Sequence, residues 1–237
     1  MKIRIKFAKT GSMKYIGHLD IMRFFQKAMR RSGMPIKYSE GFSPHQIMSF
    51  AAPLGIGLES CGEYMDITLR DDAPLITSAE GMRMLNTAMC PGMEILSFRR
   101  LPDDAKNAMS MVAAADYSVC FSGEGTEDAE VWASRLAEAA EALGERKEIL
   151  IEKENKKGET VVSDIKPYIY SLRTEGTTLF MHVSQGSEHN IRPEFVIKAL
   201  LKEEKLLQYE SLNYAITRHD LFSADGLRLE DFGETIE

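Results

Sequence analysis

The residues of this chain whose types and spacing could do chemistry gather in its first fifty positions. His18 and Asp20 stand in the run YIGHLD, and His45 follows a proline in the run YSEGFSPHQ. Histidine exchanges protons near neutral pH, and a nearby carboxylate can orient its ring. We hypothesise that His18, Asp20 and His45 meet in one pocket for a phosphate or a nucleobase edge. No third ligand for a metal stands beside them, so no metal site is predicted.

Tyr38, Gly41 and Pro44 belong to the same run as His45, and we expect them to complete the pocket. The alternative is that no shared pocket forms. Asp20 would then stabilise the N-terminal end of its own helix through the helix dipole, and His45 would cap its loop. Because His18 and Asp20 are two residues apart, they do not share a helix face and are not an obvious catalytic dyad.

The loop of residues 38–50 combines several residues with special backbone or stacking properties. Gly41 permits unusual backbone angles, and Pro44 stiffens the approach to the next strand. Phe42 offers either a stacking face or a plug for the core. The chain has neither GxxxxGK[ST] nor GxGxxG, so a nucleotide-binding phosphate loop is not supported.

A basic stripe is predicted on the helix that follows His18. Arg23, Lys27 and Arg30 are spaced to share one helix face, and Arg31 lies at its edge. Such a stripe suits a phosphate backbone, although most charge runs are simply solvated helix faces. The candidate nucleic-acid-binding residues are Arg23, Lys27, Arg30, Arg31, Phe42 and His45.

The distribution of charge along the chain supports a polyanion-facing surface near the N-terminus. The chain has a net charge of −7, yet residues 1–50 hold ten Lys/Arg and two Asp/Glu, and the remainder holds 19 and 34. Charge asymmetry of this kind is typical of a segment that faces a polyanion. Lys2, Arg4 and Lys6 share one face of the first strand, and we expect them to add to the basic surface.

The elements that must position these residues follow one pattern twice. Period-two alternation over residues 2–9 predicts a strand with Ile3, Ile5 and Phe7 on its buried face. Helices, strands and turns then follow in the order β-α-β-β-α-β, within residues 1–102 and again within residues 115–237. We therefore predict an α+β protein of two tandem ferredoxin-like domains with antiparallel sheets. In the second domain the predicted elements are residues 116–123, 126–143, 147–165, 177–186, 192–204 and 211–222.

Composition narrows the class of protein. The 237 residues include no apolar run long enough for a membrane span, so no membrane contact is expected. Cys61, Cys90 and Cys120 are widely spaced with no CxxC, which argues against a zinc site, an iron–sulfur site and a disulfide framework. We expect a cytoplasmic protein that needs no cofactor. The oligomeric state cannot be read from the sequence.

The motifs of the first seventy residues resemble the radical-SAM-linked protein family of bacteria. That family's pattern is of the type HLD-x-x-R…RR-x-x-x-P…YS-x-GF-x-PH…SF-x-x-PL-x-x-G-x-x-S, and Gln46 departs from it where Pro is expected after the histidine. The resemblance implies a partner of a radical SAM enzyme, in an RNA or ribosome setting. The chain has no CxxxCxxC and cannot hold that enzyme's cluster itself. The matching positions are His18, Leu19, Asp20, Arg23, Arg30, Arg31, Pro35, Tyr38, Ser39, Gly41, Phe42, Pro44, His45, Ser49, Phe50, Pro53, Leu54, Gly57 and Ser60.

Three functions remain open at this point. The first is a non-catalytic RNA-binding or adaptor protein that works with a radical SAM enzyme. The second is a metal-independent RNA endonuclease that uses His18, with Tyr15 and Lys14, as acid and base groups. That alternative draws on a fold-level likeness to CRISPR repeat-processing endonucleases. The third is a protein-interaction scaffold that uses the acidic helix 126–143, although a solvated acidic face is the better explanation of that helix.

Overall fold

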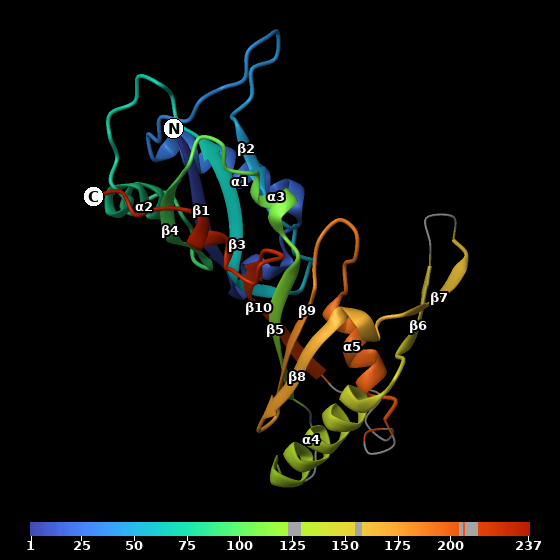
Figure 1. Ribbon diagram of the computed structural model, residues 1–237. Helices are drawn as coiled ribbons and strands as arrows, with labels where there is room; N and C mark the ends of the chain where they lie inside the picture. Colours follow the sequence, from blue (N-terminus) through green and yellow to red (C-terminus); the bar gives the residue numbers. More distant parts are fainter. Residues whose placement is uncertain (123–128, 155–157, 204–205, 207–212) are drawn as a thin grey trace. The chain divides into compact units, whose positions relative to one another are not determined.

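The computed structural model describes residues 1–122, 129–154, 158–203, 206 and 213–237. It is a mixed α+β structure with mostly antiparallel strands, and it forms two compact units (Figure 1). The first unit combines residues 1–113 with residues 218–237, and the second comprises residues 114–217. The change of unit after residue 113 falls in the predicted connector. Residues 218–237, however, belong with the first unit, whereas the sequence placed them in the second domain.

The first unit has the element order that the sequence predicted. Strand β1 (Lys2–Lys9) pairs antiparallel with β3 (Glu59–Thr68) and with β4 (Met93–Leu101), and β2 (Met48–Phe50) pairs antiparallel with β3. The sheet order is therefore β4-β1-β3-β2, and the C-terminal part of β10 (Asn213–Phe222) also lies beside β3. The helical segments are η1 (Gly11–Tyr15), α1 (His18–Arg31), α2 (Ser78–Asn86), α3 (Ala108–Met111) and η4 (Leu229–Phe232).

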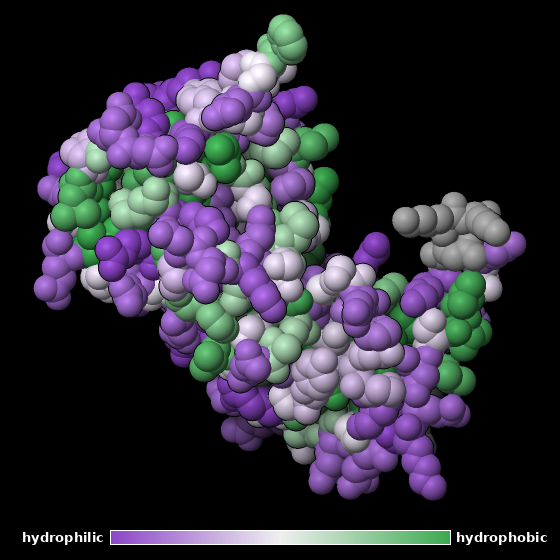
Figure 2. All heavy atoms as spheres, turned by 45° about the horizontal axis from the view of Figure 1, so that its top comes forward, coloured by the Kyte–Doolittle hydropathy of each residue, from purple (hydrophilic) through white to green (hydrophobic). Residues whose placement is uncertain are grey.

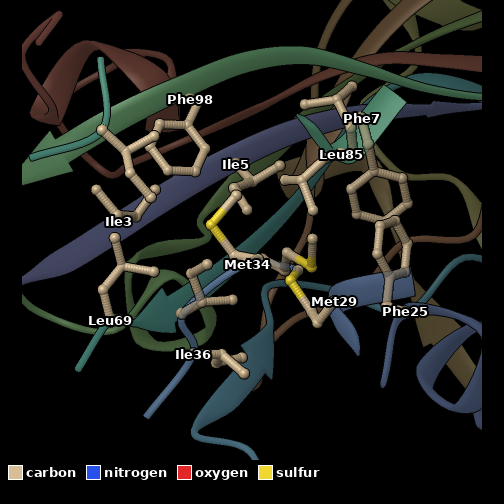
Figure 3. Packing of buried hydrophobic residues seen from close by; sticks show 14 of the residues in the cluster. Ile3, Ile5, Phe7, Phe25, Met29, Met34, Ile36, Leu69, Leu85 and Phe98 are labelled. Atoms are coloured by element: carbon tan, nitrogen blue, oxygen red, sulfur yellow. The ribbon is translucent and has the colours of Figure 1, made fainter. Parts of the chain in front are cut away.

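The core of the first unit lies between one face of this sheet and helices α1 and α2. Ile3, Ile5 and Phe7 alternate along β1 and are buried, as the period-two pattern predicts. Phe25 of α1 and Leu85 of α2 are also buried in this cluster, as Figure 3 shows. Burying one such side chain contributes about 1.5–3 kcal/mol. This layer fixes α1 on the sheet and so sets which side of the helix faces solvent.

The other face of β1 is polar but does not form the basic surface that we expected. Arg4 is completely buried, and its guanidinium donates to both carboxylate oxygens of Asp66 at 2.8 and 2.9 Å. The ammonium of Lys2 donates to the main-chain oxygen of Asp103 at 2.5 Å. The expectation that Arg4 adds to an RNA-facing surface is therefore wrong, because Arg4 is buried and paired with Asp66. The same holds for Lys6, because carboxylates neutralise its charge.

Lys6 is held by acidic residues of the C-terminal segment. Its ammonium lies 2.7 Å from both Asp220 and Glu230. Burial alone would lower the pKa of Lys6, but these two carboxylates outweigh it and raise that pKa. The phenol of Tyr64 donates to Asp220 at 2.5 Å, and burial together with that carboxylate raises the pKa of Tyr64 far above its ordinary value. Residues 218–237 thus complete the polar face of the first unit.

The second unit repeats the order of strands with one insertion. Its sheet follows the order β10-β5-β9-β8, formed by β5 (Ala114–Ser122), β8 (Ile169–Glu175), β9 (Thr178–Ser184) and the N-terminal part of β10, and β9 is antiparallel to both β5 and β8. Helices α4 (Ala129–Glu145) and α5 (Pro193–Leu200) contribute Trp132, Leu136 and Val196 to its core. Of the residues predicted for these elements, 123, 126–128, 155–157, 204 and 211–212 lie outside the described residues.

The predicted strand 147–165 is instead a separate hairpin. Strands β6 (Leu150–Glu154) and β7 (Thr160–Asp164) pair only with each other, with Ile151 opposite Ser163. The strand that joins the sheet in its place is β8, which the sequence analysis did not predict. Both stretches alternate, and only a partner strand far along the chain decides which of them joins a sheet. Exposed apolar side chains, including those of Leu150 and Val162, lie along the hairpin, where green side chains border the grey ones in Figure 2.

The described helices include none with the length and apolar character that crossing a membrane requires.

Candidate functional site

Helix α1 presents all four of the predicted basic residues to solvent. Its apolar side is buried on the sheet, and Arg23, Lys27 and Arg30 are exposed on the remaining surface. Arg23 forms an ion pair with Asp20 one turn earlier, at 3.1 Å. Arg31 behaves differently, because its guanidinium donates to the main-chain oxygen of Ala88 at 2.8 Å and so is fixed within the unit. The stripe available to a ligand is therefore Arg23, Lys27 and Arg30.

The loop between α1 and β2 projects away from the unit (Figure 1). Its base is a short ladder in which Ser39 N–H donates to the His45 oxygen at 2.8 Å and Ile47 N–H donates to the Lys37 oxygen at 2.9 Å. Gly41 at the tip has φ of +108°, which favours glycine. Phe42 is fully exposed beside it, at 111% relative exposure. Of the two roles left open for Phe42, the core plug is excluded and the stacking face remains.

Gln46 joins the base of this loop to α1. Its side chain is buried, and its amide nitrogen lies 3.2 Å from the main-chain oxygen of Gln26 and 3.3 Å from the hydroxyl of Tyr38. Proline, which the family pattern led us to expect here, has no side-chain donor for these bonds. The departure at Gln46 therefore has a structural consequence: the loop is held against the helix that carries the basic stripe.

The predicted pocket residues have separate partners. The Nδ1 atom of His45 lies 2.8 Å from the hydroxyl oxygen of Ser39, so His45 stabilises its own loop. Asp20 pairs with Arg23 and does not orient an imidazole. Tyr38 bonds to Gln46 at the base of the loop, and Pro44 is exposed at its tip. These contacts match the alternative in which the helix and the loop are stabilised locally.

His18 begins α1 and packs against the sheet. Gly17 is the N-cap, and the imidazole meets the Phe50 ring edge-on with the centroids 5.4 Å apart. His18 lines a cavity with Lys9 and Glu63, and no residue of the loop 38–47 lines it. The structure therefore places His18 in a site that lacks the predicted partners Asp20 and His45.

Sequence reasoning missed the charged residues around this cavity. Lys9 is 3% exposed, and Glu63 and Arg218 are also buried. The guanidinium of Arg218 binds Glu63 at 2.6 Å. Burial lowers the pKa of Lys9, Arg218 lowers it further, and Glu63 opposes both. A signal was present for Lys9, since it occupies the position after Ile3, Ile5 and Phe7 where the alternation expects an apolar residue.

The described residues hold no cluster of three or more His, Cys, Asp or Glu side chains suited to a metal ion.

Comparisons with known proteins identify a family but no activity. A family model described as "Uncharacterized protein conserved in bacteria (DUF2344)" matches residues 2–193. The search of curated proteins gave no match. Among solved structures, the chain is similar to one titled "Crystal Structure of an Unknown Protein from Galdieria sulphuraria", with 10% identity over 92% of this chain and 97% of that one and a TM-score of 0.28. A TM-score this low gives no support to a shared fold. None of these matches mentions radical SAM enzymes.

Proposed function

The chain belongs to the bacterial DUF2344 family, and we propose that this member binds single-stranded RNA without cleaving it. The RNA would lie on a surface formed by Arg23, Lys27, Arg30 and Phe42, which we name the α1–loop surface. Proteins that bind single strands combine a basic track for the backbone with aromatic side chains on which bases stack. The α1–loop surface has both parts.

The observation that carries this proposal is the exposure of Phe42 on an anchored loop. Phe42 is fully exposed at the loop tip, so its ring is available for a base to stack on. The Gln46 bond to the Gln26 oxygen keeps the loop base beside the basic stripe. A base stacked on such a ring contributes about 1–3 kcal/mol, and the three cations would follow the neighbouring phosphates.

The proposal is tested by titrating a fluorescent single-stranded RNA into the protein over a range of salt concentrations. We expect Arg23→Glu with Lys27→Glu to abolish most of the affinity. For the residual binding, the slope of log affinity against log salt concentration should become shallower by about 1.4. Each single-strand phosphate contact contributes about 0.7 to that slope, and two contacts are removed. Phe42→Ala should weaken binding by about 1–3 kcal/mol with an unchanged salt slope.

A matched control separates the site from the overall charge. Lys147→Glu with Lys198→Glu makes the same change in net charge at exposed positions of the second unit. This variant should bind RNA within about twofold of the original protein, because neither lysine belongs to the α1–loop surface and exposed charges outside a binding site are screened by salt. Equal losses in the two double variants would refute a local site, and so would unchanged affinity in a folded Arg23→Glu, Lys27→Glu protein.

We do not extend the proposal to RNA cleavage. His18, the candidate acid or base, lies edge-on to Phe50, and Asp20 is paired with Arg23. Neither arrangement activates His18 for proton transfer from a ribose hydroxyl. RNA cleavage in EDTA that disappears in His18→Ala would overturn this part of the proposal.

The sequence resemblance adds a partner and a setting to the proposal. We include a radical SAM enzyme as the protein partner and, from composition and element order, a cytoplasmic location and a ferredoxin-like fold for both units. The order β4-β1-β3-β2 in the first unit and β10-β5-β9-β8 in the second supports the last of these. Purification of the tagged protein with its bound RNA and proteins tests the partner. Recovery of protein partners without RNA would favour the scaffold alternative instead.

A further inference from the structure

A buried lysine without a bonding partner stands in the cavity beside His18. Lys9 is the last residue of β1, and its side chain lines the cavity together with His18 and Glu63. Among the described residues, none forms a hydrogen bond or an ion pair with its ammonium group. Buried ammonium groups are nearly always paired, because removing the charge from water is costly. Lys9 as a residue is 3% exposed and its ammonium lacks a bonded partner within the described part of the unit, so the cavity is a candidate site for something that the chain itself does not supply.

The one carboxylate that lines the cavity is already bound by another cation. Glu63 carries the negative charge, and Arg218 uses it through three hydrogen bonds of 3.0, 2.6 and 2.7 Å that reach both carboxylate oxygens. The carboxylate is thereby committed to Arg218, and it acts on Lys9 only through space. A monoanion next to Lys9 would supply the bonded partner that Glu63 does not.

We propose that this cavity binds the carboxylate of a small organic acid, with the Lys9 ammonium as its cationic partner and the His18 imidazole as a second donor. This site lies apart from the α1–loop surface and does not depend on RNA binding. It gives His18 a role in binding a ligand in place of acid–base catalysis.

The walls of the cavity favour a carboxylate over a phosphate. Beyond the polar groups the lining is apolar, and it consists of Phe7, Ile16, Ile21, Phe50, Ala52, Pro53 and Leu54. A phosphate is strongly hydrated and requires several donors, whereas this site offers one ammonium and one imidazole next to the Glu63 carboxylate. A flat monoanion with a short apolar body leaves fewer polar atoms without partners.

The dimensions of the cavity limit the ligand to a few non-hydrogen atoms. Its volume is about 20 Å³, so only a ligand as small as formate or acetate is expected to enter. Phe50 and Leu54 are buried, whereas Pro53 is exposed at the edge. A ligand would therefore place its carboxylate next to Lys9 and its short apolar body between Phe50 and Leu54.

The experiment measures binding of formate, acetate, propionate and inorganic phosphate to the full chain by calorimetry at constant ionic strength. We expect saturable binding of a carboxylate that is tighter than that of phosphate. Lys9→Met keeps an unbranched side chain of similar shape and removes the charge, and it should weaken binding about tenfold or more. Lys14→Met is the matched control, because Lys14 lies outside the cavity lining and its nearest anion is Glu59 at 3.6 Å.

A second measurement does not depend on how well the variant folds. In protein labelled with ¹³C-lysine, addition of acetate should shift the ε-methylene signal of Lys9 and leave that of Lys14 in place. Equal affinity in Lys9→Met and the original protein would overturn the site, and so would acetate that shifts both lysine signals alike. Tighter binding of phosphate than of any carboxylate would overturn the assignment of the ligand.

Discussion

At the scale of single residues, the pair Glu63–Arg218 makes a sharp prediction about stability. Glu63→Ala removes the carboxylate that binds the buried Arg218 guanidinium, and it leaves Lys9 next to the altered position. We expect the free energy of unfolding to fall by about 3–5 kcal/mol, as it does when one partner of a buried ion pair is removed. Urea denaturation followed by circular dichroism measures the change.

The control for this prediction is Glu59→Ala. Glu59 also pairs with a lysine, Lys14, but the distance is 3.6 Å and both side chains are partly exposed. Because such pairs contribute about 0–1 kcal/mol, the loss should stay below 1 kcal/mol. If the two variants lose the same stability, the Glu63–Arg218 pair is not the buried anchor that its geometry indicates.

Lys9 also predicts how stability depends on pH. Burial lowers the pKa of Lys9 below its ordinary value of 10.5, and 10.5 describes the unfolded chain. Between the two values the unfolded chain binds more protons, so the free energy of unfolding contributed by Lys9 rises with pH across that window. Lys9→Met lacks this contribution. The difference in unfolding free energy, original protein minus Lys9→Met, should therefore increase as pH rises toward 10.5; a difference that stays flat or decreases contradicts the prediction.

The sequence shows some residue roles and conceals others for a physical reason. Alternation within β1 identifies Ile3, Ile5 and Phe7 as core, because side-chain direction in a strand depends only on local geometry. The burial of Arg4 depends on Asp66, more than sixty positions away, and cannot be read locally. Lys9 breaks the alternation, and that break was the one local sign of the cavity.

At the scale of elements, two helical glycines predict opposite effects of the same substitution. Gly144 in α4 has open space where a Cβ would lie, whereas a Cβ on Gly81 in α2 would lie 2.8 Å from the ring of Phe98. Alanine is the better helix former, so Gly144→Ala should stabilise by about 0.5 kcal/mol. Gly81→Ala should destabilise by about 1–3 kcal/mol, because α2 must move away from β4.

The measurement for the two glycine variants is thermal unfolding with hydrogen exchange of each unit. Gly144→Ala should slow exchange in α4, and Gly81→Ala should speed exchange in α2 and β4. A gain in stability for Gly81→Ala would show that α2 does not pack on Phe98 as closely as the structure has it.

The elements themselves were predicted unevenly. The order of the first unit followed from patterns that are local to each strand and helix. In the second unit, β8 and the hairpin β6–β7 have similar alternating sequences, and the sheet accepts only the one that meets β9. Pairing of strands distant in sequence is a property of the folded chain, so local patterns cannot rank such competitors.

At the scale of the whole molecule, the chain returns to its first unit at its end. Strand β10 passes from the second unit to the first, and a Cβ on Gly62 of β3 would lie 2.3 Å from the main-chain oxygen of His219. Ser78 and Ile236 exchange two hydrogen bonds, each of 2.9 Å. Nothing local in the sequence predicts this return, because all of these contacts join positions more than 150 residues apart.

The return of the chain makes residues 218–237 necessary for the first unit. Truncation after Thr217 deletes Arg218, the partner of Glu63, and it deletes Asp220 and Glu230, the partners of Lys6. It also exposes the part of the core that Ile236 covers. We expect the truncated chain to lose cooperative unfolding of the first unit, while exchange protection in β5, β8 and β9 persists. Residues 1–113 joined to residues 218–237 by a short Gly/Ser linker should instead fold alone, because this chain contains both segments of the first unit. Dispersed amide signals from the truncated chain's first unit, or their absence from the joined chain, would show that the C-terminal segment is not part of that unit's core.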